Sequence, residues 1–255
     1  MNKTDEPALS IRGLHKSYGS KVSVNRVDLH VPRGSFFGLV GPNGAGKTTL
    51  LSMAVGLLRP DAGTSVVLGS DVWSDRLNAK RQLGVLPDGL ALPEFLTGRE
   101  VLTYLGRLRG LDPALVDARA QELLTMMGLV DAERTLVVDY STGMRKKIGL
   151  ATALLHDPGL LVLDEPFEAV DPLSAVTLKR ILTQLVAQGR SVVLSSHVMT
   201  LVEELCDTVA VMSNGRVVAS GPLAQVRGKV TLDEAFVALV DPHSGGPETL
   251  SWLGT

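Results

Sequence analysis

Four short runs of apolar residues stand out along the chain, at 36–40, 160–163, 191–194 and 209–212. Continuous apolar runs of this length are typical of parallel strands buried on both faces of a sheet. Segments 9–14 and 22–31 alternate loosely between apolar and polar residues, which predicts strands with one exposed face. Between the second and third runs, apolar residues recur with helical spacing at Leu178, Ile181, Leu182, Leu185 and Val186. Strands that alternate with helices predict an α/β fold with a parallel sheet.

The stretch 88–158 differs from its surroundings. It carries helical patterns around 100–108 and 113–127 and no clear strand pattern, so we interpret it as a helical lobe inserted in the sheet domain. A further helix is expected at 48–58. One domain is predicted over residues 1–240. A loose C-terminal tail is expected over 241–255, because Pro242, Gly245, Gly246 and Pro247 favour turns.

Composition sets few limits on function but excludes some classes. The 255 residues carry a net charge of −2 with interspersed signs, so we expect no nucleic-acid partner attracted by bulk charge. Cys206 is the single cysteine, which rules out an internal disulfide. No apolar stretch approaches the roughly 20 residues of a membrane helix. A partner would therefore have to supply any membrane span.

The most informative motif has the spacing G-x-x-x-x-G-K-T, which is that of the phosphate-binding P-loop. Glycines let the backbone turn tightly and bring N–H groups close to phosphate oxygens. The lysine adds a positive charge for the β- and γ-phosphates, and the following hydroxyl suits Mg²⁺. The flanking strand and helix argue against the alternative of a glycine-rich surface turn. The predicted ATP-binding residues here are Gly41, Pro42, Asn43, Gly44, Ala45, Gly46, Lys47, Thr48 and Thr49.

Two carboxylates follow the buried run at 160–163. Asp164 and Glu165 lie where that strand ends, and ligands bind at this edge of a parallel sheet. Asp164 is predicted to hold Mg²⁺ through water, and Glu165 to polarise a water for attack on the γ-phosphate. An apolar strand that ends in Asp-Glu is often only a strand running into solvent, but the P-loop favours the functional interpretation.

A third feature is the segment 140–144 before an apolar helical stripe of Met144, Ile148, Ala151 and Leu155. Ser141 is a good N-cap, and a Ser-x-Gly at a helix start can also bind an anion. By itself this would be an ordinary capped helix. Its place shortly before the Asp-Glu strand is what makes it informative.

The order of these motifs, with a lone His197 after a strand, resembles an ATP-binding-cassette (ABC) transporter ATPase over residues 9–221. The resemblance implies a P-loop NTPase core with a mixed sheet, an N-terminal antiparallel portion and an inserted helical lobe. It also implies that Tyr18 stacks on adenine and that His197 contacts the γ-phosphate.

Residues 140–144 match the family signature Leu-Ser-Gly-Gly-Gln. Ser141 and Gly143 are retained, whereas Thr142 and Met144 depart. In the family this signature closes on the γ-phosphate held by the other subunit, and a loop matched by Asp171 crosses the same interface. The resemblance therefore implies a head-to-tail pair of ATPase domains, identical or related, with two ATP molecules between them.

At one position this chain differs from the usual family residue in a way that bears on mechanism. The family usually has a glutamine where this chain has Asp88, four residues after Gly84. A carboxylate is a hard oxygen ligand and can still meet Mg²⁺. We therefore predict a catalytic and metal-binding role for Asp88, beside a loop that touches the membrane partner.

These features together predict the ATP-hydrolysing subunit of an ABC transporter. We expect it at the cytoplasmic face of the membrane, held there by a separate transmembrane permease subunit. Analogy favours export of drugs, antibiotics, peptides or lipids. The alternatives are an importer ATPase, which often has an added C-terminal domain, and a soluble ABC ATPase, which usually has two cassettes or a long coiled coil. A GTPase would normally show Asn-Lys-x-Asp, which residues 78–81 do not match.

Overall fold

The computed structural model describes residues 6–240, so the predicted tail over 241–255 lies outside it. Its centre is a six-stranded sheet in the order β10-β9-β3-β8-β7-β6. Strands β9, β3, β8, β7 and β6 run parallel, and β10 pairs antiparallel with β9. The strands are β3 (Phe36–Val40), β6 (Leu83–Leu86), β7 (Leu160–Leu163), β8 (Ser191–Ser196), β9 (Thr208–Ser213) and β10 (Arg216–Pro222). All four apolar runs are therefore confirmed as strands.

A second, antiparallel sheet has the order β2-β1-β4-β5. The two loosely alternating segments form its first two strands and are longer than predicted. The bounds are β1 (Leu9–Tyr18), β2 (Lys21–Val31), β4 (Ala62–Val67) and β5 (Ser70–Asp71). The expected combination of a mixed sheet with an N-terminal antiparallel portion is confirmed.

The central sheet separates two hydrophobic cores, because its side chains alternate between faces. Phe36 and Val40 of β3 belong to the core shared with the helices of the segment 98–154 and those after β7, whereas Phe37 and Leu39 belong to the core shared with the antiparallel sheet and the helix at 47–54. Burial on both faces explains why these strands read as unbroken apolar runs.

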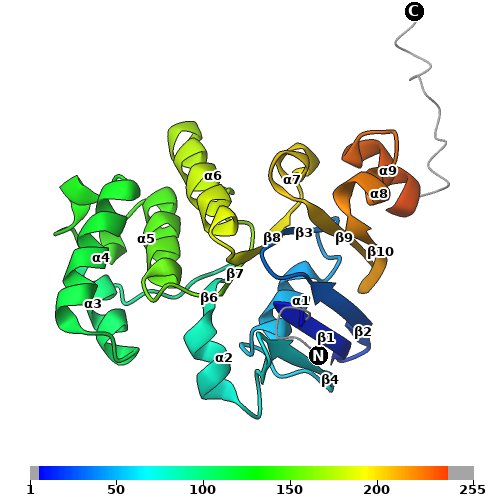
Figure 1. Cartoon of the computed structure of the whole chain (residues 1–255), viewed down its shortest axis with the longest axis horizontal. Helices are drawn as coiled ribbons and strands as arrows, with labels where there is room; N and C mark the ends of the chain where they lie inside the picture. The colour runs from blue at the N-terminus through cyan, green and yellow to red at the C-terminus, as the bar shows by residue number, and fades with distance from the viewer. Residues whose placement is uncertain (1–5, 241–255) are drawn as a thin grey trace, which may run out of the picture.

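Three longer helices occupy the segment 88–158 and lie together at one end of the molecule (Figure 1). They are α3 (Gly98–Leu108), α4 (Pro113–Met126) and α5 (Thr142–Leu154), with short 3₁₀ turns at Val130–Ala132 and Val137–Asp139. Thr97, Asp112 and Ser141 cap α3, α4 and α5 with their side-chain oxygens. As predicted, residues 88–158 contain no strand. Thr97 and Leu136 form an isolated bridge there.

The remaining helices pack around the sheets. The stripe that begins at Leu178 faces the core from α6. The helix expected at 48–58 is shorter than predicted and ends at Ala54, because the chain turns at Gly56 with φ 76°. Within residues 6–240, no helix is both long and apolar enough to cross a membrane. The bounds are α1 (Lys47–Ala54), α2 (Arg76–Gln82), α6 (Pro172–Ala187), α7 (Met199–Leu205), α8 (Leu223–Arg227) and α9 (Leu232–Val240).

Candidate active site

The predicted P-loop joins the end of β3 to the start of α1. Two of its glycines lie where no side chain fits. A Cβ on Gly41 would come within 2.3 Å of the Met212 carbonyl oxygen, and one on Gly46 within 2.3 Å of the Ser23 carbonyl oxygen. Gly46 also has φ 102°, a conformation that glycine adopts without strain. Glycine at both positions therefore lets the loop pack closely against these backbones at the N-terminus of α1, where free N–H groups favour an anion.

Lys47 is almost completely enclosed, with a side chain only 7% exposed. Its Nζ donates hydrogen bonds to the carbonyl oxygens of Gly41 at 2.8 Å and Pro42 at 3.4 Å. The Nζ lies 3.9 Å from Glu165 Oε1. Burial lowers the pKa of Lys47, and the charges of Glu165 and Asp164 partly oppose that shift. A buried ammonium at the first residue of α1 is suited to bind an anion such as phosphate.

The segment after β7 carries the acidic pair. Asp164 is 4% exposed and accepts a hydrogen bond from the Ser195 hydroxyl. Glu165 has φ 46°, which is unusual for a residue with a side chain. Its Oε2 lies 3.1 Å from Nδ1 of His197, at the end of β8. Parallel pairing of β7 with β8 therefore brings the predicted catalytic glutamate and histidine together.

A pocket of about 390 Å³ collects most of the predicted site residues. Asp88 reaches it because β6 pairs parallel with β7, so the two strands end at the same edge of the sheet. Asp164 lies buried beside Glu165, outside the lining. The lining residues are Lys21, Ser23, Asn43, Gly44, Ala45, Gly46, Lys47, Thr48, Thr49, Asp88, Glu165, Glu168 and His197.

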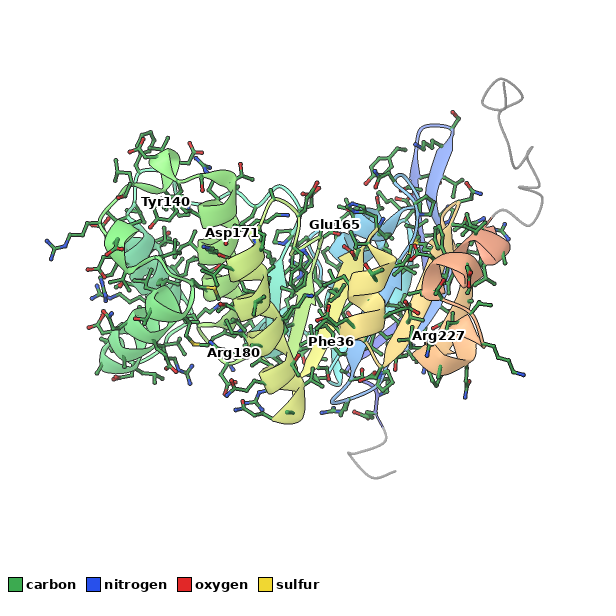
Figure 2. The ribbon with its side chains drawn as sticks, turned by 90° about the horizontal axis from the view of Figure 1, so that it is seen from above. Phe36, Tyr140, Glu165, Asp171, Arg180 and Arg227 are labelled. Atoms are coloured by element: carbon green, nitrogen blue, oxygen red, sulfur yellow. The ribbon has the colours of Figure 1, made fainter. Side chains whose placement is uncertain are left out.

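Six predicted nucleotide contacts do not line this pocket: Gly41 and Pro42 at the start of the P-loop, and four residues outside the loop, which are Tyr18, Ser141, Gly143 and Asp171. Tyr18 ends β1 and is 52% exposed, with Lys16 Nζ 5.8 Å from its ring centroid. Ser141 and Gly143 open α5, and Asp171 opens α6. In the view of Figure 2, Asp171 lies between Glu165 and Tyr140. Exposed positions outside a chain's own pocket suit contact with a second subunit, and for these residues that role stays a prediction.

Asp171 has a local structural role that the sequence argument did not include. Its carboxylate caps α6 by accepting hydrogen bonds from the Ser174 N–H at 2.9 Å and from the Ser174 hydroxyl. Lys147 Nζ lies 3.5 Å away. The Ser174 bonds, followed by the Lys147 charge, lower the pKa of Asp171 to about 2. The carboxylate is therefore ionised at any ordinary pH.

Sequence reasoning also missed contacts around the acidic pair. Lys146 Nζ donates to the Glu165 carbonyl oxygen at 2.6 Å and lies 3.6 Å from a carboxylate oxygen of Glu168. The Ser195 hydroxyl contacts both members of the acidic pair. The sequence offered no signal for the first contact. For Ser195, the only signal was its place two residues before His197.

Comparison with known proteins identifies the chain's relatives. The family model described as ABC transporter matches residues 24–168. A daunorubicin/doxorubicin resistance ATP-binding protein of Streptomyces peucetius is 37% identical over 96% of this chain and 74% of its own length. A Nod factor export ATP-binding protein of Burkholderia lata is 36% identical over 92% of this chain and 77% of its own. A linearmycin resistance ATP-binding protein of Bacillus subtilis is 36% identical over 84% of this chain and 68% of its own.

Solved structures agree with these relatives. An ATP-binding subunit of an ABC transporter superposes with a TM-score of 0.85 at 31% identity, covering 91% of this chain and 99% of its own. A dimeric ATP-binding cassette bound to ADP and phosphate has a TM-score of 0.77 over 84% of this chain and 98% of its own, and at 21% identity it supports the fold alone. The resemblance based on the motifs is thereby confirmed. The chain belongs to the ABC transporter family, as an ATP-binding subunit that is an ATPase.

Proposed function

We propose that this ATPase powers export through a separate transmembrane permease, to which it binds at the cytoplasmic face of the membrane. The observation that carries the proposal is the pocket in which Lys47, Glu165 and His197 meet beside the P-loop. Relatives named for daunorubicin/doxorubicin resistance, linearmycin resistance and Nod factor export favour export over import. Amphiphilic drugs, antibiotics, peptides or lipids are the proposed substrate class.

The pocket supports hydrolysis of ATP by an attacking water. Lys47 binds the terminal phosphates, because its ammonium is the buried cation of the pocket. Glu165 accepts a proton of the water through a carboxylate oxygen, and His197, 3.1 Å from the other oxygen, orients this carboxylate and reaches the γ-phosphate. Phosphoryl transfer needs such positioning more than covalent chemistry.

The donor set fits Mg²⁺. The Thr48 hydroxyl and the Asp88 carboxylate line the pocket, and the Asp164 carboxylate lies buried next to it. All three supply the hard oxygen atoms that Mg²⁺ prefers. When bound, Mg²⁺ would neutralise charge that develops on the phosphates.

Two copies, or one copy and a related subunit, are proposed to close head to tail on two ATP molecules. Ser141 is exposed at the start of α5, and Gly143, two residues later, is partly exposed in its first turn. Free N–H groups at a helix start favour a phosphate. Since neither residue lines the chain's own pocket, a second subunit's nucleotide is the proposed ligand of α5.

Fractionation tests the proposed function. Cells that express the chain together with its permease, which would be sought first among the neighbouring genes, are expected to show the chain in the membrane fraction, and cells without the permease are not. Inverted vesicles from the first cells should show ATP-dependent uptake of an amphiphilic dye, with little support from GTP. Association with ribosomes instead would indicate a soluble ABC ATPase, and would contradict the proposal.

Ser141→Arg is expected to depress hydrolysis at least about tenfold while the affinity of the isolated chain for ATP stays unchanged. The larger side chain would block approach of the second subunit, and the chain's own P-loop would not be touched. Ser141→Ala separates added bulk from loss of the hydroxyl, because it removes the cap on the Met144 N–H, which typically contributes about 1 kcal/mol, without enlarging the side chain. Weaker ATP binding by monomeric Ser141→Arg would show that the helix start acts within one chain.

Asp88→Ala is expected to slow hydrolysis more than Asp88→Gln, because alanine removes the oxygen ligand and glutamine retains one. ATPase rates at fixed Mg²⁺, with and without the permease, test this prediction. Asp117→Ala, at an exposed position on α4, is the matched control for loss of one carboxylate. Wild-type rates for Asp88→Ala in both conditions would identify Asp88 as a solvated loop residue.

A further inference from the structure

A single buried hydroxyl joins the two acidic residues of the site. Ser195 on β8 is fully buried, with 0% exposure. Its Oγ donates a hydrogen bond to Asp164 Oδ1 and accepts one from the Glu165 N–H at 2.9 Å. A serine hydroxyl has one proton to donate and lone pairs to accept, so both bonds form at once. The register of β7 and β8 creates this contact, because Leu163 pairs with Leu194 and the next residues meet.

The bond to Asp164 matters because a buried carboxylate needs a donor. Within residues 6–240, the Ser195 hydroxyl is the group that donates a hydrogen bond to this carboxylate. The bond occupies one oxygen and sets the rotation of the carboxylate. Without it, Asp164 would be free to turn toward the buried ammonium of Lys47, whose pKa the Asp164 charge raises against the effect of burial.

The bond to Glu165 matters because its backbone is strained. A φ of 46° in a residue other than glycine persists only when surrounding contacts hold it. Two contacts do so here: Ser195 binds the N–H of Glu165, and Lys146 Nζ binds its carbonyl oxygen at 2.6 Å. These bonds direct the Glu165 side chain into the pocket, toward His197.

We propose that Ser195 is a positioning residue whose hydroxyl orients the Asp164 carboxylate toward Mg²⁺ and holds the Glu165 backbone for activation of water. One hydroxyl thus couples metal binding to hydrolysis. This inference rests on the Mg²⁺–ATP site of the proposed function. Ser195 itself touches neither nucleotide nor water, since it does not line the pocket.

The neighbouring serine provides a matched control. Ser196 is also buried, but its hydroxyl accepts a hydrogen bond from the Val198 N–H at 3.0 Å, near the start of α7. Ser196→Ala therefore removes a buried hydroxyl one residue away and leaves the acidic pair untouched.

Calorimetric titration with the non-hydrolysable analogue AMP-PNP, in Mg²⁺ and in EDTA, tests the proposal. Ser195→Ala is expected to bind the analogue in EDTA within about twofold of wild type, because the P-loop is unchanged. The gain in affinity on adding Mg²⁺ should fall about tenfold, as expected for loss of a hydrogen bond to a charged group. The kcat for ATP should fall by a similar factor, while the KM in saturating Mg²⁺ changes little. Ser196→Ala should match wild type in all of these measurements.

Further variants separate positioning from folding. Ser195→Cys has nearly the same shape and is well tolerated in cores, but is a weak donor, so it should also lose the Mg²⁺-dependent gain. In an Asp164→Asn background, Ser195→Ala should have no further effect on the Mg²⁺-dependent gain. The role of Ser195 would be overturned if both Ser195 variants kept the wild-type gain in AMP-PNP affinity on adding Mg²⁺. It would also be overturned if Ser196→Ala lost as much of that gain as the Ser195 variants. If wild-type protein gains no affinity from Mg²⁺, the proposed metal site itself is wrong.

Discussion

Lys47→Ala is expected to weaken ATP binding by at least about 100-fold, the largest loss of nucleotide affinity among the variants proposed for this chain. A charged hydrogen-bond donor contributes roughly 1.5–3 kcal/mol, and its removal from a closed pocket also removes the charge that balances the phosphates. Lys47 is 7% exposed and lies within reach of two loop carbonyls. Equilibrium titration of both proteins with AMP-PNP measures the difference.

Loss of folding would not explain this result. Burial disfavours the charged form of Lys47, so its removal should not lower the melting temperature of the nucleotide-free protein. Lys80→Ala on α2 is the control, because it removes one lysine from an exposed position. Wild-type affinity in Lys47→Ala would show that the P-loop lysine does not bind the terminal phosphates.

Glu165→Gln is expected to leave ATP binding intact and to slow turnover by about 10²–10⁴-fold, the usual contribution of a general base. Glutamine has the same shape and can still hydrogen-bond to His197, so the pocket should keep its geometry. Because the unhydrolysed γ-phosphate would remain between the subunits, a dimer should accumulate with ATP. Single-turnover hydrolysis and light scattering, with and without ATP, measure the two effects.

Glu168→Gln is the matched control for this variant. Glu168 lines the same pocket, and its substitution by glutamine removes the same charge. Unlike Glu165, however, Glu168 is exposed and pairs with Lys146. It should hydrolyse ATP within about threefold of wild type, as expected for an exposed ion pair. If Glu165→Gln stays monomeric at saturating ATP, both alone and with the permease, the shared site is contradicted.

Much of this protein can be predicted from its sequence, because the relevant signals are local. Continuous apolar runs predicted β3, β7, β8 and β9, since a strand buried on both faces must be apolar throughout. The spacing of glycines and Lys47 predicted a phosphate loop, because close approach of a backbone to an anion needs those residues in that order. The place of Asp164 and Glu165 after a buried strand likewise predicted a ligand-binding edge.

Elements without such signals were missed. β6 follows α2 without a break and is interrupted by Gly84, and β10 alternates at the edge of the sheet, so neither stood out as an apolar run. The early end of α1 depends on the conformation of Gly56, which helical periodicity does not reveal.

The tertiary structure alone decided which distant residues meet. Asp88, Glu165 and His197 come from three different strand ends and share a pocket only because β6, β7 and β8 are parallel neighbours. The pairing of the Ser195 hydroxyl with Asp164 depends on the register of two strands about 30 residues apart in sequence. Local patterns in the sequence were enough to predict the phosphate loop, the acidic pair and the central strands. Strand order and register decided how they assemble, because long-range pairing is selected by the packing of the whole core and leaves no periodic trace in any one segment.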